Sequence, residues 1–197
     1  MIKQFKDYAE TQAYSDSVQL PRGGYVCKII GAKVETNDKG QSIKVAFDIS
    51  EGDYSGHFAQ KFAANTNEDK KWPGTYTLYV PKDDGSQQDG WTKRRFKTFT
   101  NALEDSNEGY HFDWDETKFK GKLVGLVFNY REWSWNGKTG MAPNPANATS
   151  VAAIREGKYK IPQDRYLNGS APAANNAAEI PEGFVNVPAG ADEEIPF

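Results

Sequence analysis

One short segment constrains the fold more than any other. Over residues 42–49 apolar and polar side chains alternate strictly, and the apolar positions are Ile43, Val45, Phe47 and Ile49. A period of two is typical of a β-strand with one face in a core and the other toward solvent. Such a strand needs partner strands, so we expect a sheet with one buried face.

Further segments have strand character. They are rich in β-branched and aromatic residues, or end in turn signals, and they cover residues 25–34, 57–62, 75–80, 122–132 and 150–154. Residues 37–40 (Asn-Asp-Lys-Gly) predict a turn, and Asn136-Gly137 predicts a tight type I′ hairpin turn. Pro143 and Pro145 interrupt the strand after this hairpin, which is therefore expected to be short or to lie at a sheet edge.

From Trp91 onward the periodicity changes. Phe96, Phe99 and Leu103 are spaced by three and four residues, which predicts an amphipathic helix with a basic outer face (Lys93, Arg94, Arg95 and Lys97). Five or six short strands and one inserted helix favour a mainly β fold, an OB-fold-like β-barrel (an oligonucleotide-binding barrel). A different small barrel is also compatible with this pattern.

Composition divides the chain into three parts. Residues 1–20 are a polar lead-in, residues 21–167 form the predicted barrel domain, and residues 168–197 are rich in Ala, Asn, Pro, Gly and Glu, which predicts a disordered acidic tail. The net charge is −3, but five acidic residues lie in the tail, which leaves 24 basic against 22 acidic residues in the body. Charge therefore neither excludes nor establishes binding to nucleic acid.

Targeting signals and membrane segments are absent from the pattern. Residues 1–7 hold no apolar stretch typical of a secretory signal, and no apolar run approaches the roughly 18 residues of a membrane span. Cys27 is the only cysteine and so cannot form an intramolecular disulfide. We therefore expect a cytoplasmic protein that does not bind membranes.

The chain ends with Asp192, Glu193, Glu194, Ile195, Pro196 and Phe197. Phe197 can enter an apolar pocket while its terminal carboxylate meets a basic group, and the acids can pair with a basic rim. This ending closely resembles that of bacterial single-stranded DNA-binding proteins, in which the terminal Phe docks on replication and repair enzymes. The resemblance implies the same partner-binding role for these six residues; a solubilising tail is the alternative.

The body resembles single-stranded DNA-binding proteins of bacteriophage and mobile-element replication modules instead. Residues 47–52, 103–110 and 121–122 carry that likeness. It implies a barrel that binds single-stranded DNA, and a bacterial host cytoplasm if the chain is phage-encoded, without identifying the contact residues.

The late strand offers the chemistry that a single strand of DNA requires, which is rings for the bases and cations for the phosphates. Val124, Leu126, Phe128 and Tyr130 have the parity of a core face. Arg131, Trp133 and Trp135 share the opposite parity as the strand enters its hairpin, and Lys138 follows the turn. We predict that they contact DNA, although the indoles can instead cap the barrel and Arg131 can form a surface ion pair.

Three further residues are candidate DNA contacts. Trp72 lies in a basic loop that begins Lys70-Lys71, and it can equally be an anchor in the core; Lys44 and Lys61 are possible groove cations. Tyr76 and Tyr79 lie on opposite faces of one strand, so at most one belongs to the core.

Enzyme motifs are not found. The sequence has neither a phosphate-binding loop nor a dinucleotide-binding glycine pattern, and His57 and His111 are the only histidines. Asp113, Asp115 and Glu116 suggest a metal-dependent nuclease only weakly, because they also suit a helix start or a turn. We expect no catalytic residues, no metal and no cofactor.

The predicted function is sequence-independent binding of single-stranded DNA. Such a protein protects single strands during replication and recombination and recruits replication and repair proteins through its tail. The alternatives are a recombination mediator or replication adaptor with weak DNA affinity, and the nuclease. RNA binding stays open because stacking does not distinguish the sugars, and a homodimer through the barrel edges is possible.

Overall fold

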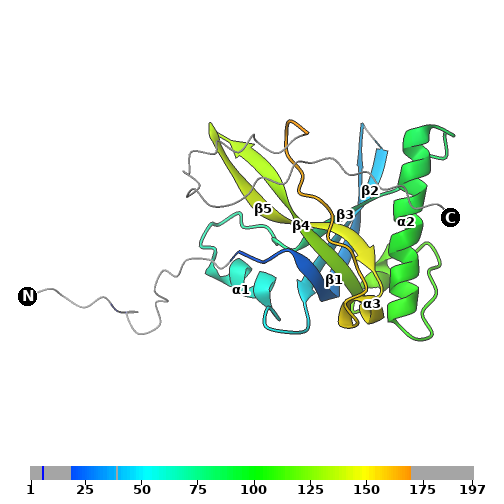
Figure 1. Ribbon diagram of the computed structural model, residues 1–197, viewed down its shortest axis with the longest axis horizontal. Helices are drawn as coiled ribbons and strands as arrows, with labels where there is room; N and C mark the ends of the chain where they lie inside the picture. Colours follow the sequence, from blue (N-terminus) through cyan, green and yellow to red (C-terminus); the bar gives the residue numbers. More distant parts are fainter. Residues whose placement is uncertain (1–5, 7–18, 39, 170–197) are drawn as a thin grey trace, which may run out of the picture.

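A computed structural model describes residues 6, 19–38 and 40–169. The fold is mainly β, with a single five-stranded antiparallel sheet in the order β3-β2-β1-β4-β5 (Figure 1). The strands are β1 (Gly23–Asn37), β2 (Gly40–Ile49), β3 (Thr75–Tyr79), β4 (Leu123–Trp135) and β5 (Lys138–Thr149). The helical elements are α1 (His57–Ala64), α2 (Gln87–Ser106), the short 3-10 helix η1 (Glu116–Phe119) and α3 (Val151–Arg155). The predicted OB-fold-like class is confirmed.

The main helix, α2, is inserted between β3 and β4 and lies against the sheet (Figure 1). It contacts both edge strands of the sheet, β3 and β5. Arg95 on α2 donates to the backbone oxygen of Ala146 on β5 (2.9 Å) and to the hydroxyl of Tyr76 on β3 (3.4 Å). The helix therefore connects the two edge strands and covers the open side of the core.

The predicted alternation of residues 42–49 is confirmed, since all four of its apolar side chains are buried. On β4, Val124, Leu126 and Phe128 are buried on the same side, and Tyr130 is half-buried. α2 contributes Phe96, Phe99 and Leu103 to this core, as its spacing predicted. Tyr76 is buried and stacks on Phe99 (5.3 Å between ring centroids), whereas Tyr79 is exposed.

Two of the predicted strands are wrong. Residues 57–62 lie in α1, because the Asp48 side chain at the end of β2 accepts hydrogen bonds from the backbone nitrogens of Phe58 (2.9 Å) and Ala59 (3.1 Å) and so caps the helix from the preceding strand. Residues 150–154 form α3 and its cap, because the Ser150 hydroxyl accepts from the nitrogen of Ala153 (3.2 Å).

The hairpin predictions are confirmed. Asn136 and Gly137 have φ angles of 47° and 73°, and the type I′ turn requires both to be positive. β5 lies at an edge of the sheet, where its two prolines remove no hydrogen bond from an interior ladder. The strand is nevertheless long, because pairing with β4 extends over its whole length.

Most of the lead-in, residue 39 and the predicted disordered tail from residue 170 lie outside the described residues. The proposed docking residues 192–197 are among them. None of the helices in the described ranges has the length and apolar character that a bilayer crossing requires.

Candidate nucleic-acid interface

The strands β4 and β5 extend beyond the rest of the sheet as a two-stranded arm. β1 pairs with β4 only from Leu123 to Phe128, whereas the β4–β5 ladder continues to the pair Trp135 and Lys138. We call residues 129–144 the β4–β5 arm, which projects at the upper left of Figure 1. In OB-folds the connection between the fourth and fifth strands commonly grips oligonucleotides.

The predicted cluster lies on one face of this arm. Side chains directly opposite each other in an antiparallel pair share a face, and the register pairs Trp133 with Gly140 and Trp135 with Lys138. Arg131 has the same parity on β4, so all four predicted contact residues are on the same side. Arg131 and Lys138 are exposed, and the indoles of Trp133 and Trp135 are 43% and 73% exposed.

Trp133 lies across the glycine opposite it. A methyl group at Gly140 would come within 2.8 Å of Cζ2 of Trp133, so the indole covers this position closely. The ring is thereby held against its own hairpin while its outer surface remains accessible. This packing accounts for part of the cross-strand role considered from the sequence, and it leaves a surface on which a base can stack.

A segment near the end of the described chain adds a cation that the sequence analysis missed. Arg165 forms a short parallel bridge with Arg131: its nitrogen donates to the oxygen of Tyr130 and its oxygen accepts from the nitrogen of Glu132, both at 2.8 Å. A small pocket of about 160 Å³ lies between the two arginines and residues 166–167. Neither guanidinium has an ion-pair partner among the described residues, so both are available to phosphates.

Asp164 holds this segment in place. Its carboxylate accepts from the nitrogen of Tyr130 (2.9 Å) and pairs with Arg22, whose guanidinium also lies 4.2 Å from the centroid of the Tyr130 ring. The hydrogen bond from Arg22 is the main reason why the pKa of Asp164 is lowered from its ordinary value. The charged form of Asp164 therefore stabilises the contact between the segment and the arm.

The lowered pKa of Asp164 predicts that the contact between this segment and the arm weakens at low pH. Because the folded-state pKa of Asp164 is lowered, its stabilising effect is complete above the unfolded value, about 3.9, and is lost as the pH falls through the folded value. We expect hydrogen exchange at the amides of Glu132 and Arg165, corrected for its intrinsic pH dependence, to accelerate in that acidic range. An Asp164→Asn variant should exchange faster already at neutral pH. Unchanged protection in this variant would show that Asp164 does not anchor the segment.

The other predicted contacts are not gathered on the arm. Lys44 lies on the outer side of β2, donates to the hydroxyl of Thr77 on β3 (2.8 Å) and stands opposite Lys33 of β1. Lys61 is exposed on α1. Trp72 is half-buried; its indole nitrogen donates to the oxygen of Phe47 (2.9 Å) and its ring packs at 5.4 Å from Phe62, which gives it a structural anchoring role. DNA contact by these three residues stays a prediction.

The acidic residues before η1 have structural partners. Asp115 caps the helix by accepting from the nitrogen of Thr117 (3.0 Å), and Asp113 forms an ion pair with Lys118. The predicted helix start is confirmed. Within the part of the chain that the structure describes, no three or more His, Cys, Asp or Glu side chains are grouped so as to hold a metal ion.

Comparison with known proteins adds no assignment. No protein-family model matches the chain, and no curated protein is significantly similar to it. The resemblance noted from the sequence therefore remains an expectation.

Proposed function

We propose that this protein binds single-stranded DNA without regard to sequence and protects it during replication and recombination. The observation that carries the proposal is the exposed face of the β4–β5 arm, where two accessible indoles lie in line with Arg131 and Lys138. Bases stack on aromatic rings whatever their identity, and cations neutralise the phosphates between them. Arg165 supports the proposal as a second guanidinium beside Arg131.

The proposal extends to location and partners. The protein acts in the cytoplasm, that of a bacterial host if the chain is phage-encoded, and residues 192–197 recruit replication and repair proteins. The support for recruitment is the chemistry of the acidic ending and its terminal Phe197. A chain that ends at Pro196 should retain DNA binding and lose binding to such proteins in a direct pull-down.

The first test is a fluorescence anisotropy titration of the full chain with a labelled mixed-sequence single strand and the matching duplex. We expect the single strand to bind more tightly and its affinity to fall as salt rises. With the three cations of the arm in contact (Arg131, Lys138 and Arg165), the slope of log K against log salt should be roughly −2, from about −0.7 for each phosphate neutralised. An RNA strand of equal sequence tests discrimination between the sugars.

Two outcomes would oppose the proposal. No binding to the single strand at low salt would remove it and favour the adaptor alternative. Cleavage of the strand in the presence of Mg²⁺ that is lost in an Asp113→Asn variant would favour the nuclease.

A further inference from the structure

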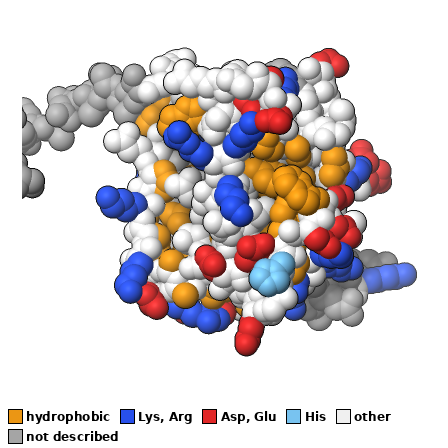
Figure 2. Space-filling view, turned by 90° about the vertical axis from the view of Figure 1, so that its right-hand side faces the viewer, with side chains coloured by type: hydrophobic (Ala, Val, Ile, Leu, Met, Phe, Trp, Pro, Cys, Tyr) orange, Lys and Arg blue, Asp and Glu red, His pale blue; other side chains and the backbone are white. Residues whose placement is uncertain are grey.

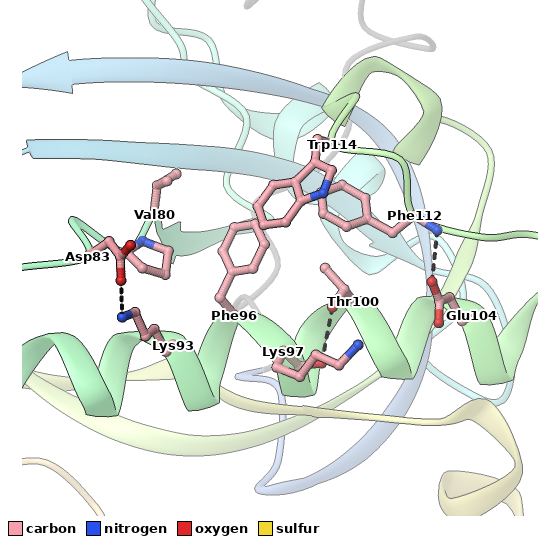
Figure 3. A pocket seen from close by; sticks show the side chains of 10 residues that line it. Val80, Asp83, Lys93, Phe96, Lys97, Thr100, Glu104, Phe112 and Trp114 are labelled. Carbon is pink, nitrogen blue, oxygen red and sulfur yellow. Dashed lines mark hydrogen bonds and ion pairs between the residues drawn. The ribbon is translucent and has the colours of Figure 1, made fainter. Parts of the chain in front are cut away.

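A second group of aromatic rings lies away from the arm, beside α2. There a pocket of about 600 Å³ is lined by residues from three segments, among them Val80, Pro81, Phe96, Lys97, Phe112 and Trp114 (Figure 3). We call it the Trp114 pocket. The space-filling view onto the side that carries α2 shows hydrophobic side chains gathered next to Lys and Arg side chains (Figure 2). This volume is within the range typical of small-ligand sites.

Trp114 is the most exposed tryptophan among the described residues, at 77%. Its ring lies nearly parallel to that of Phe96 (5.9 Å, 16°) and tilted against Phe112 (5.4 Å), so one surface of the indole is supported by the rings below it. In Figure 3 the three rings form one continuous group above α2. A large exposed area on a supported indole leaves a flat surface open to solvent.

The backbone holds Trp114 in an unusual conformation. Its φ is 68°, in the left-handed region that bulky residues rarely adopt. The residues on either side are held by the contacts already described, namely the pair of Asp113 with Lys118 and the capping bond of Asp115. Such conformations persist where surrounding contacts enforce them, and they concentrate at binding sites. Here the left-handed conformation leaves the indole ring of Trp114 exposed to solvent.

The polar groups of the pocket suit a nucleotide. Lys93 is occupied by Asp83 and Asp89, but the ammonium of Lys97 has no ion-pair partner among the residues that the structure covers. Glu104 uses Oε1 to accept from the nitrogen of Phe112 (2.8 Å). Its other carboxylate oxygen can accept from an amino group on a base edge. The pocket thus combines a stacking surface, one cation and one acceptor.

We infer that the Trp114 pocket binds a base of the single strand, stacked on Trp114, with the adjacent phosphate at Lys97. The inference rests on the proposed function and adds a second contact surface to it. A base is favoured over a peptide because the largest exposed element is a single flat ring, backed by a second ring parallel to it, which is the geometry that bases stack on. In Figure 1 the arm and α2 lie on opposite sides of the molecule, so the two surfaces contact different parts of a strand.

The test compares two tryptophans near α2. Trp91 is 56% exposed on α2 itself and does not line the pocket, so Trp91→Ala is the matched control for Trp114→Ala. In anisotropy titrations of the full chain with a mixed single strand of about 30 nucleotides, Trp114→Ala should weaken binding roughly 5- to 150-fold, the range expected for one stacked base. Trp91→Ala should change affinity less than about twofold, and Trp114→Phe should restore most of the loss.

Thermal unfolding of each variant shows whether the fold is retained. A strand carrying 5-iodouracil, irradiated in complex with the wild-type chain, should form a cross-link that peptide mapping assigns to Trp114. If the wild type binds the strand but Trp114→Ala matches Trp91→Ala and no cross-link forms at Trp114, the inference fails while the proposed function stands, and the pocket serves another class of ligand, such as a peptide. If the wild type does not bind the strand, the proposed function fails and the inference fails with it.

Discussion

Replacing Trp133 and Trp135 together by alanine is expected to weaken binding to single-stranded DNA by about 2 to 6 kcal/mol. Each stacked base is worth roughly 1–3 kcal/mol, and both indoles lie accessible on one face of the β4–β5 arm. Duplex binding should change little, because paired bases are not available for stacking. The measurement is the anisotropy titration at one fixed salt concentration, with single and double variants side by side.

Two controls separate stacking from charge and from folding. Arg131→Ala should reduce the salt slope by about 0.7 and leave stacking in place, whereas the tryptophan variants should leave the slope nearly unchanged. Trp133 also covers Gly140, so the melting temperature of each variant must be compared. A double variant that folds and binds the single strand with wild-type affinity would remove the arm from the interface.

Phe47→Ala is expected to lower the free energy of unfolding by about 3 to 5 kcal/mol, which is a large part of the typical total of 5–15 kcal/mol. Phe47 is fully buried near the C-terminal end of β2, and its ring centroid lies 5.3 Å from that of Phe58 on α1 and 6.1 Å from that of Phe128 on β4. Its removal leaves a cavity where these three elements meet. Equilibrium unfolding in guanidinium chloride measures the loss.

Phe62→Ala is the matched control. Phe62 is half-buried on α1 and packs on Trp72, so its truncation removes less buried contact. It should lower the free energy of unfolding clearly less than Phe47→Ala does. Equal losses for the two variants would mean that the junction around Phe47 is not the centre of the core.

The parts of the fold that the sequence predicted are those that local chemistry determines. The alternation around Phe47, the three-and-four spacing of Phe96 and Phe99, and the Asn136-Gly137 turn depend on neighbouring residues only. α1 could not be predicted in the same way, because its cap is Asp48 on another element. For α3 the signal was local: Ser150 is an ordinary capping residue, but the β-branched and apolar residues after it favour a strand by their composition.

In the candidate site, too, the sequence predicted what depends on neighbouring residues and did not predict what depends on distant ones. The shared face of Arg131, Trp133 and Trp135 followed from strand parity. Arg165 could not be found, because the contact that places it depends on Asp164 meeting Arg22, 142 positions earlier. Trp114 lies in a polar stretch of the sequence that gave no sign of a binding surface. Its left-handed backbone and the parallel ring of Phe96, which expose and support the indole, are visible only in the structure.

The position of α2 has a consequence for how copies of this chain behave when crowded. Open edges of a sheet invite identical chains to add strands, which leads to aggregation. Here Arg95 of α2 forms hydrogen bonds with both edge strands, β3 and β5. On β5, Pro143 and Pro145 lack the backbone N–H donors that an added strand would need. We therefore expect the protein to stay dispersed at high concentration, and any pairing of copies to use surfaces other than a sheet continued from one molecule to the next.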